Sequence, residues 1–267
     1  MIRPFKAAAL QFRIDMGDVD ANAVRAFALL RQAAKQGASL AVLPEMWSTG
    51  FAYDRLAVLS DSTPEILRSL CKFASGKRMA IAGSLPERTG RSVSNTLYVI
   101  DRKGAIAGQY RKAHLFQPSD EHLHFRRGTA AEVVRTDLGN IGPLICYDLR
   151  FPEISRKYFL EDADLLCVSA QWPSIRKGHW ELLNTARAVE NQLFVVAANA
   201  VGTSGSFRFS GGSMIMSPLG ERLAFGGDEE GLATAVVDLS KAVEFRRRIP
   251  CALDRNVRAY RPTRRKR

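Results

Sequence analysis

The sequence predicts an α/β protein in which helices cover a core of two β-sheets. Two observations support this prediction. Segments with the pattern of buried strands alternate with segments of helical period along almost the whole chain. No low-complexity linker interrupts this alternation over the 267 residues, so we expect a single domain that spans residues 1–267.

The first half of the chain is predicted to hold two helices and five strands. An amphipathic helix is expected over residues 21–36 and a second over residues 64–75, with Thr63 as its N-cap and Gly76 at its end. Residues 101–104 have the composition of a hairpin turn. Strands are expected over residues 7–12, 40–43, 79–84, 95–100 and 105–110.

The second half repeats the alternation after a long loop. Helices are expected over residues 152–160 and 180–191, and we expect Ser240 to cap a last helix that Pro250 ends. Residues 202–206 are predicted to form a flexible loop and not a phosphate cradle, because no Walker lysine follows them. Strands are expected over residues 133–136, 141–145, 165–168, 194–199, 213–216, 221–224 and 233–238.

The cysteines are widely spaced and form no Cys-x-x-Cys pair, which argues against a disulfide framework and a cysteine zinc site. This usage is typical of the reducing cytoplasm. Three histidines near residue 120 have no nearby cysteine to complete a zinc site, so no metal is expected. No stretch of about 18 apolar residues is present, and the first residues lack the apolar region of a signal peptide, so we expect no membrane association.

Most of the net charge of +12 lies at the end of the chain. Residues 241–267 form a basic C-terminal segment with 11 Lys or Arg and 2 Asp or Glu, which gives the segment a net charge of +9. No RNA-binding aromatic motif or zinc-finger spacing accompanies this charge, which argues against a nucleic-acid partner. We expect residues 264–267 to form a solvated tail.

Three of the expected strands each lead directly to a residue with a reactive or ionisable side chain, namely Glu45, Lys112 and Cys146. Cys146 lies where a strand turns toward a helix, and there free backbone N–H groups and the helix dipole favour a thiolate. A thiol, a carboxylate and an ammonium that converge would supply a nucleophile, a proton carrier and an oxyanion partner. Together they meet the requirements for attack on a carbon bonded to nitrogen.

The segments around these residues resemble the three signatures of the nitrilase (carbon–nitrogen hydrolase) superfamily. They read Leu-Pro-Glu-Met at residues 43–46, Tyr-Arg-Lys-Ala-His-Leu-Phe at residues 110–116 and Ile-Cys-Tyr-Asp-Leu-Arg-Phe-Pro-Glu at residues 145–153. One such segment is weak evidence, but three in the right order are highly specific. Weaker matches follow in order, so the resemblance covers nearly the whole chain; these lie at residues 120–122, 180–183, 186–192 and 211–213.

The resemblance implies a four-layer α-β-β-α sandwich that pairs with a second subunit into a homodimer. It also implies a Glu-Lys-Cys catalytic set that works without a metal or an organic cofactor. Carried over by position, Cys146 is the nucleophile, Glu45 is the general base and acid, and Lys112 stabilises the oxyanion together with the backbone N–H of Tyr147. Glu121 matches the second glutamate often found near the lysine; the other interpretation of Glu121 is a surface loop carboxylate.

Within the superfamily, residues 119–125 and 146–152 look most like the ω-amidase branch, which deamidates α-keto acid amides such as α-ketoglutaramate. A small half-amide of this kind needs a cation for its distal carboxylate. Arg150 is the first candidate, because arginine can clamp a carboxylate with two hydrogen bonds, although it could instead pair with a neighbouring carboxylate. Arg176 and Lys177 are further candidates.

Aromatic side chains are expected to form the apolar walls of the substrate site. Trp172, Phe116 and Tyr53 are the candidates, although aromatic residues near proline often serve packing alone. The predicted partner is therefore a small amide.

Other activities stay open within the enzyme class, namely a deaminated-glutathione amidase, a carbamoylase or a nitrilase. A hypothesis from a different class is a non-catalytic oligomerising or nucleic-acid-associated protein that uses the basic C-terminal segment. The complete set of Glu45, Lys112 and Cys146 argues against this second class.

Overall fold

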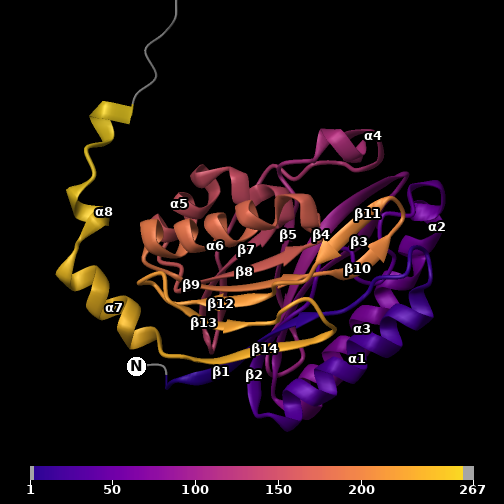
Figure 1. The fold of residues 1–267 in the computed structure, drawn as a ribbon, viewed down its shortest axis with the longest axis horizontal. Coiled ribbons are helices and arrows are strands. Elements are labelled where there is room, and N and C mark those ends of the chain that lie inside the picture. The colour runs from indigo at the N-terminus through magenta and orange to yellow at the C-terminus, as the bar shows by residue number, and fades with distance from the viewer. Residues whose placement is uncertain (1–2, 261–267) are drawn as a thin grey trace, which may run out of the picture.

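One six-stranded sheet is formed mainly by the first half of the chain. The computed structural model describes residues 3–260. The strands of this sheet are β1 (Phe5–Gln11), β2 (Ala38–Val42), β3 (Ala80–Thr89), β4 (Ser92–Ile100), β5 (Ile106–Arg111) and β14 (Gly231–Val237), in the order β14-β1-β2-β3-β4-β5. The helices α1 (Val19–Lys35) and α3 (Thr63–Lys77) cover its outer face (Figure 1).

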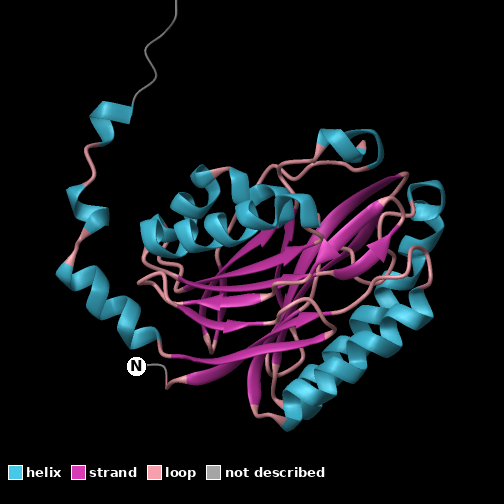
Figure 2. Cartoon of the chain, in the orientation of Figure 1, coloured by secondary structure: helices cyan, strands magenta, loops and turns pink. Residues whose placement is uncertain are grey.

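A second six-stranded sheet lies against the first. Its strands are β6 (Val134–Thr136), β7 (Gly139–Ile145), β8 (Leu165–Ala170), β9 (Phe194–Asn199), β12 (Met214–Met216) and β13 (Arg222–Phe225), in the order β13-β12-β9-β8-β7-β6. The helices α5 (Pro152–Leu160) and α6 (Lys177–Asn191) cover its outer face (Figure 2). These layers form the predicted four-layer α-β-β-α sandwich, so the predicted fold class is confirmed.

The burial of β1 shows why each sheet needs a layer on both sides. Ala7 and Ala9 lie in the core between the sheets, whereas Ala8 and Leu10 lie in the core beneath α1 and α3. All four side chains are fully buried. Successive side chains of a strand point to opposite faces, so a strand that is apolar at every position must be covered on both faces.

The smaller elements lie around the two sheets. They are α2 (Leu56–Leu59), α4 (Glu121–His124), β10 (Val201–Ser204), β11 (Phe207–Ser210), α7 (Leu239–Arg248) and α8 (Cys251–Asp254). The segment of α7 and α8 extends away from the sheets (Figure 1). Residues 264–267, predicted to be a solvated tail, lie outside the described residues. Over residues 3–260, no helix combines the length and the apolar character needed to cross a membrane.

Two of the predicted helix caps are wrong. Thr63 is already helical, and its hydroxyl donates a hydrogen bond to the backbone oxygen of Pro86 at 2.6 Å, because α3 continues directly from a preceding 3-10 turn. At α7 the N-cap is Asp238, whose side chain accepts a hydrogen bond from the backbone nitrogen of Ser240. A carboxylate two residues upstream therefore performs the role predicted for the serine.

The predicted loop at residues 202–206 is instead part of a hairpin. β10 and β11 pair antiparallel, and Ser204 lies opposite Phe207. Gly205, with a φ of +57°, allows the tight two-residue turn between them. β10 is short and mostly polar, so its sequence lacks the apolar pattern that predicts a strand.

The segment that follows β2 is hydrogen-bonded to the end of β8 in the second sheet. Strands β2 and β8 are each parallel to a neighbour in their own sheet. The Ser169 hydroxyl of β8 donates to the backbone oxygen of Leu43 at 2.8 Å, and the Glu45 backbone nitrogen donates to the Ala170 oxygen at 3.3 Å. These bonds bring Glu45, which follows a strand of the first sheet, against the second sheet.

Candidate active site

Lys112 is the centre of a buried cluster of charges. Its ammonium donates to Oε1 of Glu45 at 2.7 Å and to Oε1 of Glu121 at 2.8 Å, and its side chain has no exposed surface. Burial alone opposes the charge of a lysine, but the carboxylates of Glu121 and Glu45 raise the pKa of Lys112 well above its ordinary value. The ammonium therefore stays charged at neutral pH.

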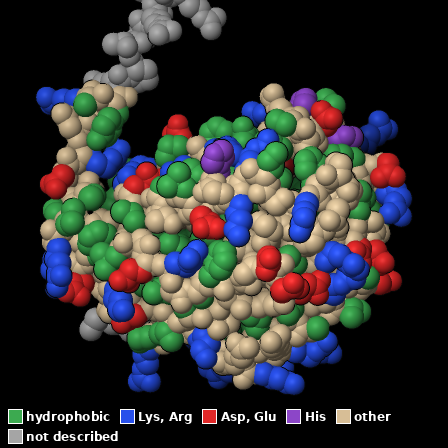
Figure 3. All heavy atoms as spheres, viewed as in Figure 1, with side chains coloured by type: hydrophobic (Ala, Val, Ile, Leu, Met, Phe, Trp, Pro, Cys, Tyr) green, Lys and Arg blue, Asp and Glu red, His purple; other side chains and the backbone are tan. Residues whose placement is uncertain are grey.

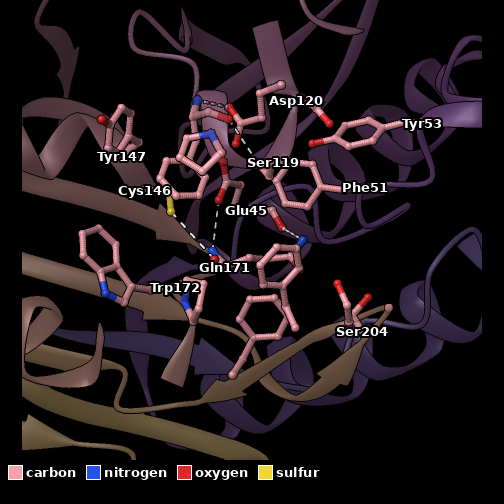
Figure 4. A pocket seen from close by; sticks show the side chains of 18 of the residues that line it. Glu45, Phe51, Tyr53, Ser119, Asp120, Cys146, Tyr147, Gln171, Trp172 and Ser204 are labelled. Carbon is pink, nitrogen blue, oxygen red and sulfur yellow. Dashed lines mark hydrogen bonds between the residues drawn. The ribbon is translucent and has the colours of Figure 1, made fainter. Parts of the chain in front are cut away.

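Glu45 is held in one orientation by further donors. The Asn95 amide donates to Oε1 at 2.8 Å, and the Gln171 backbone nitrogen donates to Oε2 at 3.0 Å. The Gln171 side chain also donates to the Glu45 backbone oxygen at 2.9 Å. Figure 4 shows Glu45 beside Gln171 and Cys146. Contacts to both oxygens leave the carboxylate little freedom to turn.

Glu121 lies at the start of α4 and is only 3% exposed. Its second oxygen, Oε2, accepts a hydrogen bond from the backbone nitrogen of Phe116 at 3.1 Å. The alternative interpretation of a surface loop carboxylate is therefore wrong. Glu121 is therefore a second buried carboxylate bonded to the Lys112 ammonium.

Cys146 is the first residue of a 3-10 turn, Cys146–Arg150, and has a φ of +44°. Its Sγ faces the backbone oxygen of Gln171 at 3.8 Å. Burial, followed by the nearby Glu45 carboxylate, raises the pKa of the Cys146 thiol well above its ordinary value. The resting group is therefore a neutral thiol, because burial outweighs the expected favouring of a thiolate. The helix dipole contributes little, since α5 begins only at Pro152 and the dipole acts within about one turn.

A cavity of about 620 Å³ opens beside this cluster. Cys146, Glu45 and Glu121 all contribute to its lining. Aromatic rings form much of the remaining wall (Figure 4). They come from segments that follow strands of both sheets and from the β10–β11 hairpin. These rings belong to Phe51, Tyr53, Phe116, Tyr147, Trp172, Phe207 and Phe209.

The four residues predicted to contact substrate all line this cavity; they are Tyr147, Arg150, Trp172 and Phe116. The Arg150 guanidinium lies 5.0 Å from the centre of the Trp172 ring, and its Nη2 lies 3.2 Å from Nδ1 of His179. Within residues 3–260, no carboxylate forms an ion pair with Arg150, so its predicted alternative role is not observed. The guanidinium is thus available to an anion in the cavity.

The other two predicted cations differ in position. Arg176 lines the cavity, and its guanidinium lies 5.7 Å from the centre of the Phe116 ring. Lys177 does not line the cavity, and its ammonium lies 5.9 Å from the ring of Phe225. Arg176 therefore remains a candidate for contact with the substrate, and Lys177 does not.

Two residues of the cluster were missed from the sequence. Asn95 and Gln171 fix the Glu45 carboxylate, and both are buried. Gln171 directly follows β8, so the pattern of a polar residue at the end of a buried strand would have found it. Asn95 lies inside β4, where only the burial of a polar side chain marks it.

In the part of the chain that the structure describes, no group of three or more His, Cys, Asp or Glu side chains is placed to hold a metal ion. The charged residues that line the cavity are Glu45, Asp54, Asp120, Glu121, Arg150 and Arg176. Over the face drawn in Figure 3, basic and acidic side chains are interspersed and do not gather into one basic patch.

Comparison with known proteins gives one consistent result. Residues 6–247 match the carbon–nitrogen hydrolase family. A 2-oxoglutaramate amidase of Bacillus subtilis (strain 168) is 40% identical over 245 residues, which cover 91% of this chain and 94% of that protein. An omega-amidase of Escherichia coli (strain K12) is 37% identical over 221 residues, or 82% of this chain and 84% of that protein.

The fold gives the same answer. A carbon–nitrogen hydrolase superfamily protein from Xanthomonas campestris, solved with an arsenic adduct in its active site, has a TM-score of 0.86. It is 31% identical to this chain and covers 95% of this chain and 98% of its own. The sequence comparisons and the structural comparison therefore indicate the same family over nearly the whole chain.

The raised pKa of Cys146 predicts how its alkylation depends on pH. A protonated thiol reacts only through its small thiolate fraction, which grows about tenfold per pH unit below the pKa. We expect the rate of Cys146 alkylation by iodoacetamide, followed by peptide mass spectrometry, to rise without a plateau up to about pH 9. Cys146→Ser controls for labelling of the other cysteines, and a plateau below pH 8 would contradict the raised pKa.

Proposed function

Because the chain belongs to the carbon–nitrogen hydrolase family, we propose that it hydrolyses small ω-amides of α-keto acids, such as α-ketoglutaramate (2-oxoglutaramate), to the acid and ammonia. The observation that carries this proposal is that Cys146 and Glu45 line one cavity and that the Lys112 ammonium is bonded to Glu45 beside it. The reaction passes through a thioester on Cys146. No metal or organic cofactor takes part in the proposed chemistry.

The first half of the reaction forms the thioester. Glu45 takes the proton of the neutral Cys146 thiol as Sγ attacks the amide carbon. The negative charge that develops on the amide oxygen is stabilised by the Lys112 ammonium and by the backbone N–H of Tyr147. Glu45 then returns its proton to the amide nitrogen, the C–N bond breaks, and ammonia leaves.

The second half releases the acid. Water attacks the thioester carbon while Glu45 removes one of its protons. The C–S bond then breaks, and the Glu45 carboxyl returns the proton to Cys146. Glu121 holds the ammonium of Lys112 throughout by its own hydrogen bond, so the oxyanion partner stays in place.

The choice of substrate is supported by the relatives and by the lining of the cavity. The two curated relatives described above are named for 2-oxoglutaramate and ω-amide hydrolysis. Arg150 supplies a cation for the distal carboxylate, with Arg176 nearby in the same lining, and Trp172 and Phe116 supply apolar walls. Deaminated-glutathione amidase, carbamoylase, nitrilase and non-catalytic functions are not favoured by these relatives.

The activity is tested by an ammonia-release screen over ω-amides, ureido acids and nitriles. We expect α-ketoglutaramate to be among the best substrates, and Cys146→Ala to abolish turnover because it removes the thiol that forms the thioester. Glu121→Gln should lower kcat by about tenfold or more, since it weakens the hold on Lys112. Cys167→Ala, at a buried cysteine outside the cavity, is the matched control. Turnover that survives in Cys146→Ala would contradict the covalent mechanism.

The role of Arg150 is tested by replacing its charge. Arg150→Met should raise KM for α-ketoglutaramate by about 10- to 100-fold, because the carboxylate loses a charge-assisted hydrogen-bonding partner. The kinetics of butyramide, which has no carboxylate, should change little. Arg156→Met removes a guanidinium that lies 5.3 Å from the Phe159 ring, outside the cavity, and serves as the control. Equal losses for both amides would rule out carboxylate recognition.

A homodimer is part of the proposal and is supported by an exposed apolar row. Leu182 and Val189 of α6 are 66% and 42% exposed and lie two helical turns apart, and Ile175 precedes the helix with 86% exposure. Apolar side chains aligned on one helix face favour an interface with another protein surface.

This interface is tested by Leu182→Glu combined with Val189→Glu. Light scattering after size exclusion should give about twice the chain mass of 29.6 kDa for the unaltered protein and the single-chain mass for the variant. Val24→Glu, at an isolated exposed residue of α1, should leave the dimer intact. A monomeric unaltered protein would refute the dimer.

We also propose a cytoplasmic location. All four cysteines are free, which suits a reducing compartment. Recovery of the protein in the membrane or secreted fraction of lysed cells would refute this location.

A further inference from the structure

Asp148 is a buried carboxylate that lies outside the lining of the cavity. Its side chain has no exposed surface, yet no lysine or arginine pairs with it within residues 3–260. Four hydrogen-bond donors surround it instead, two on each oxygen. Such a complete set of donors is what a buried carboxylate needs, and it makes Asp148 a rigid junction between the segments that supply them.

One of these segments carries the nucleophile. The backbone nitrogen of Ile145 donates to Oδ2 of Asp148 at 3.0 Å, which ties the end of β7 to the 3-10 turn. Cys146 lies inside this short closure and has a φ of +44°, a conformation that is costly for a residue with a side chain. The Asp148 bond therefore helps to hold Cys146 in its strained geometry.

The other segment carries the ammonium. The Tyr110 hydroxyl donates to Oδ2 of Asp148 at 2.8 Å and accepts from the Ala113 backbone nitrogen at 3.1 Å. The His114 backbone nitrogen and its ring Nδ1 lie 3.1 Å and 2.8 Å from Oδ1. Lys112 lies between these residues, so the chain on both sides of it is fastened to Asp148.

The donors in this arrangement are themselves fixed. Burial, with the Asp148 charge, raises the pKa of Tyr110, so its hydroxyl stays protonated and donates. The His114 ring is stacked on Phe151 at 3.6 Å between centroids. Because a carboxylate only accepts hydrogen bonds, Nδ1 of His114 must carry the hydrogen.

We propose that Asp148 is a positioning residue that fixes the distance between the Cys146 thiol and the Lys112 ammonium by fastening both backbone segments to one carboxylate. This role rests on the proposed function of Cys146 and Lys112. Asp148 does not line the substrate cavity, so it acts through Cys146, which does, and through Lys112, which is bonded to the lining residue Glu45.

The main test is Asp148→Asn, which keeps the shape but places an NH₂ group against two donors. We expect kcat for α-ketoglutaramate to fall by about 100-fold, the loss typical of a misplacement of about 1 Å, while KM changes by less than about threefold. Thermal unfolding reports how much of the variant is folded, and kcat is normalised to the folded fraction. A normalised kcat within twofold of the unaltered enzyme would overturn the proposal.

Tyr110→Phe provides a milder variant that keeps the carboxylate. It removes one donor to Asp148 and the acceptor for Ala113, and we expect kcat to fall by about three- to tenfold. The double variant should lose little more activity than Asp148→Asn alone, because both changes break one linkage. If the losses of kcat in the two single variants add fully in the double variant, the linkage is overturned.

Tyr158→Phe is the matched control for this variant. Tyr158 is also buried, but its hydroxyl donates to the backbone oxygen of Pro143 on β7 at 2.9 Å and not to Asp148. We expect its kcat to stay within twofold even if its stability falls. A loss equal to that of Tyr110→Phe would show a general packing effect and overturn the proposal.

The rate of Cys146 alkylation by iodoacetamide provides a readout that needs no amide turnover. The positive charge of Lys112 lowers the pKa of the thiol against the larger opposing effects, so a displaced ammonium should slow alkylation by about tenfold in Asp148→Asn. If the unaltered protein hydrolyses no amide, the proposed function fails, while this rate still decides the role of Asp148. An unchanged rate would overturn the proposal.

Discussion

The buried contacts of Lys112 with Glu45 and Glu121 are the interaction on which the rest of the site depends. An isolated ammonium in a protein interior is costly, and this one is stable because two carboxylates accept hydrogen bonds from it. Each carboxylate in turn needs its own donors, which Asn95, Gln171 and the backbone supply. Removal of one member would leave a buried group without its partner.

This network requires the two-sheet architecture. Glu45, Asn95 and Lys112 come from the first sheet or its strand ends, whereas Cys146 and Gln171 follow β7 and β8 of the second. Small alanines on the facing strands are part of the core between the sheets. The sandwich therefore acts as a scaffold that brings groups from strands distant in the sequence to one edge.

The neutral state of the Cys146 thiol links structure to chemistry. A permanent thiolate would need stronger positive surroundings than one lysine balanced by two glutamates can provide. In the proposed mechanism the adjacent Glu45 carboxylate therefore accepts the thiol proton during attack. The nucleophile is then formed only as the proton is passed on, and the lysine ammonium stabilises the oxyanion.

The sequence by itself determined the layered α/β class, most of the strand and helix positions, and the identities of Glu45, Lys112 and Cys146. Strand periodicity and short motifs are local properties, so they can be seen along the chain. The tertiary structure decided the support of Asn95 and Gln171, the hairpin at residues 201–210, and the protonation of the thiol. These depend on burial and on contacts between residues far apart in the chain, which no local pattern encodes.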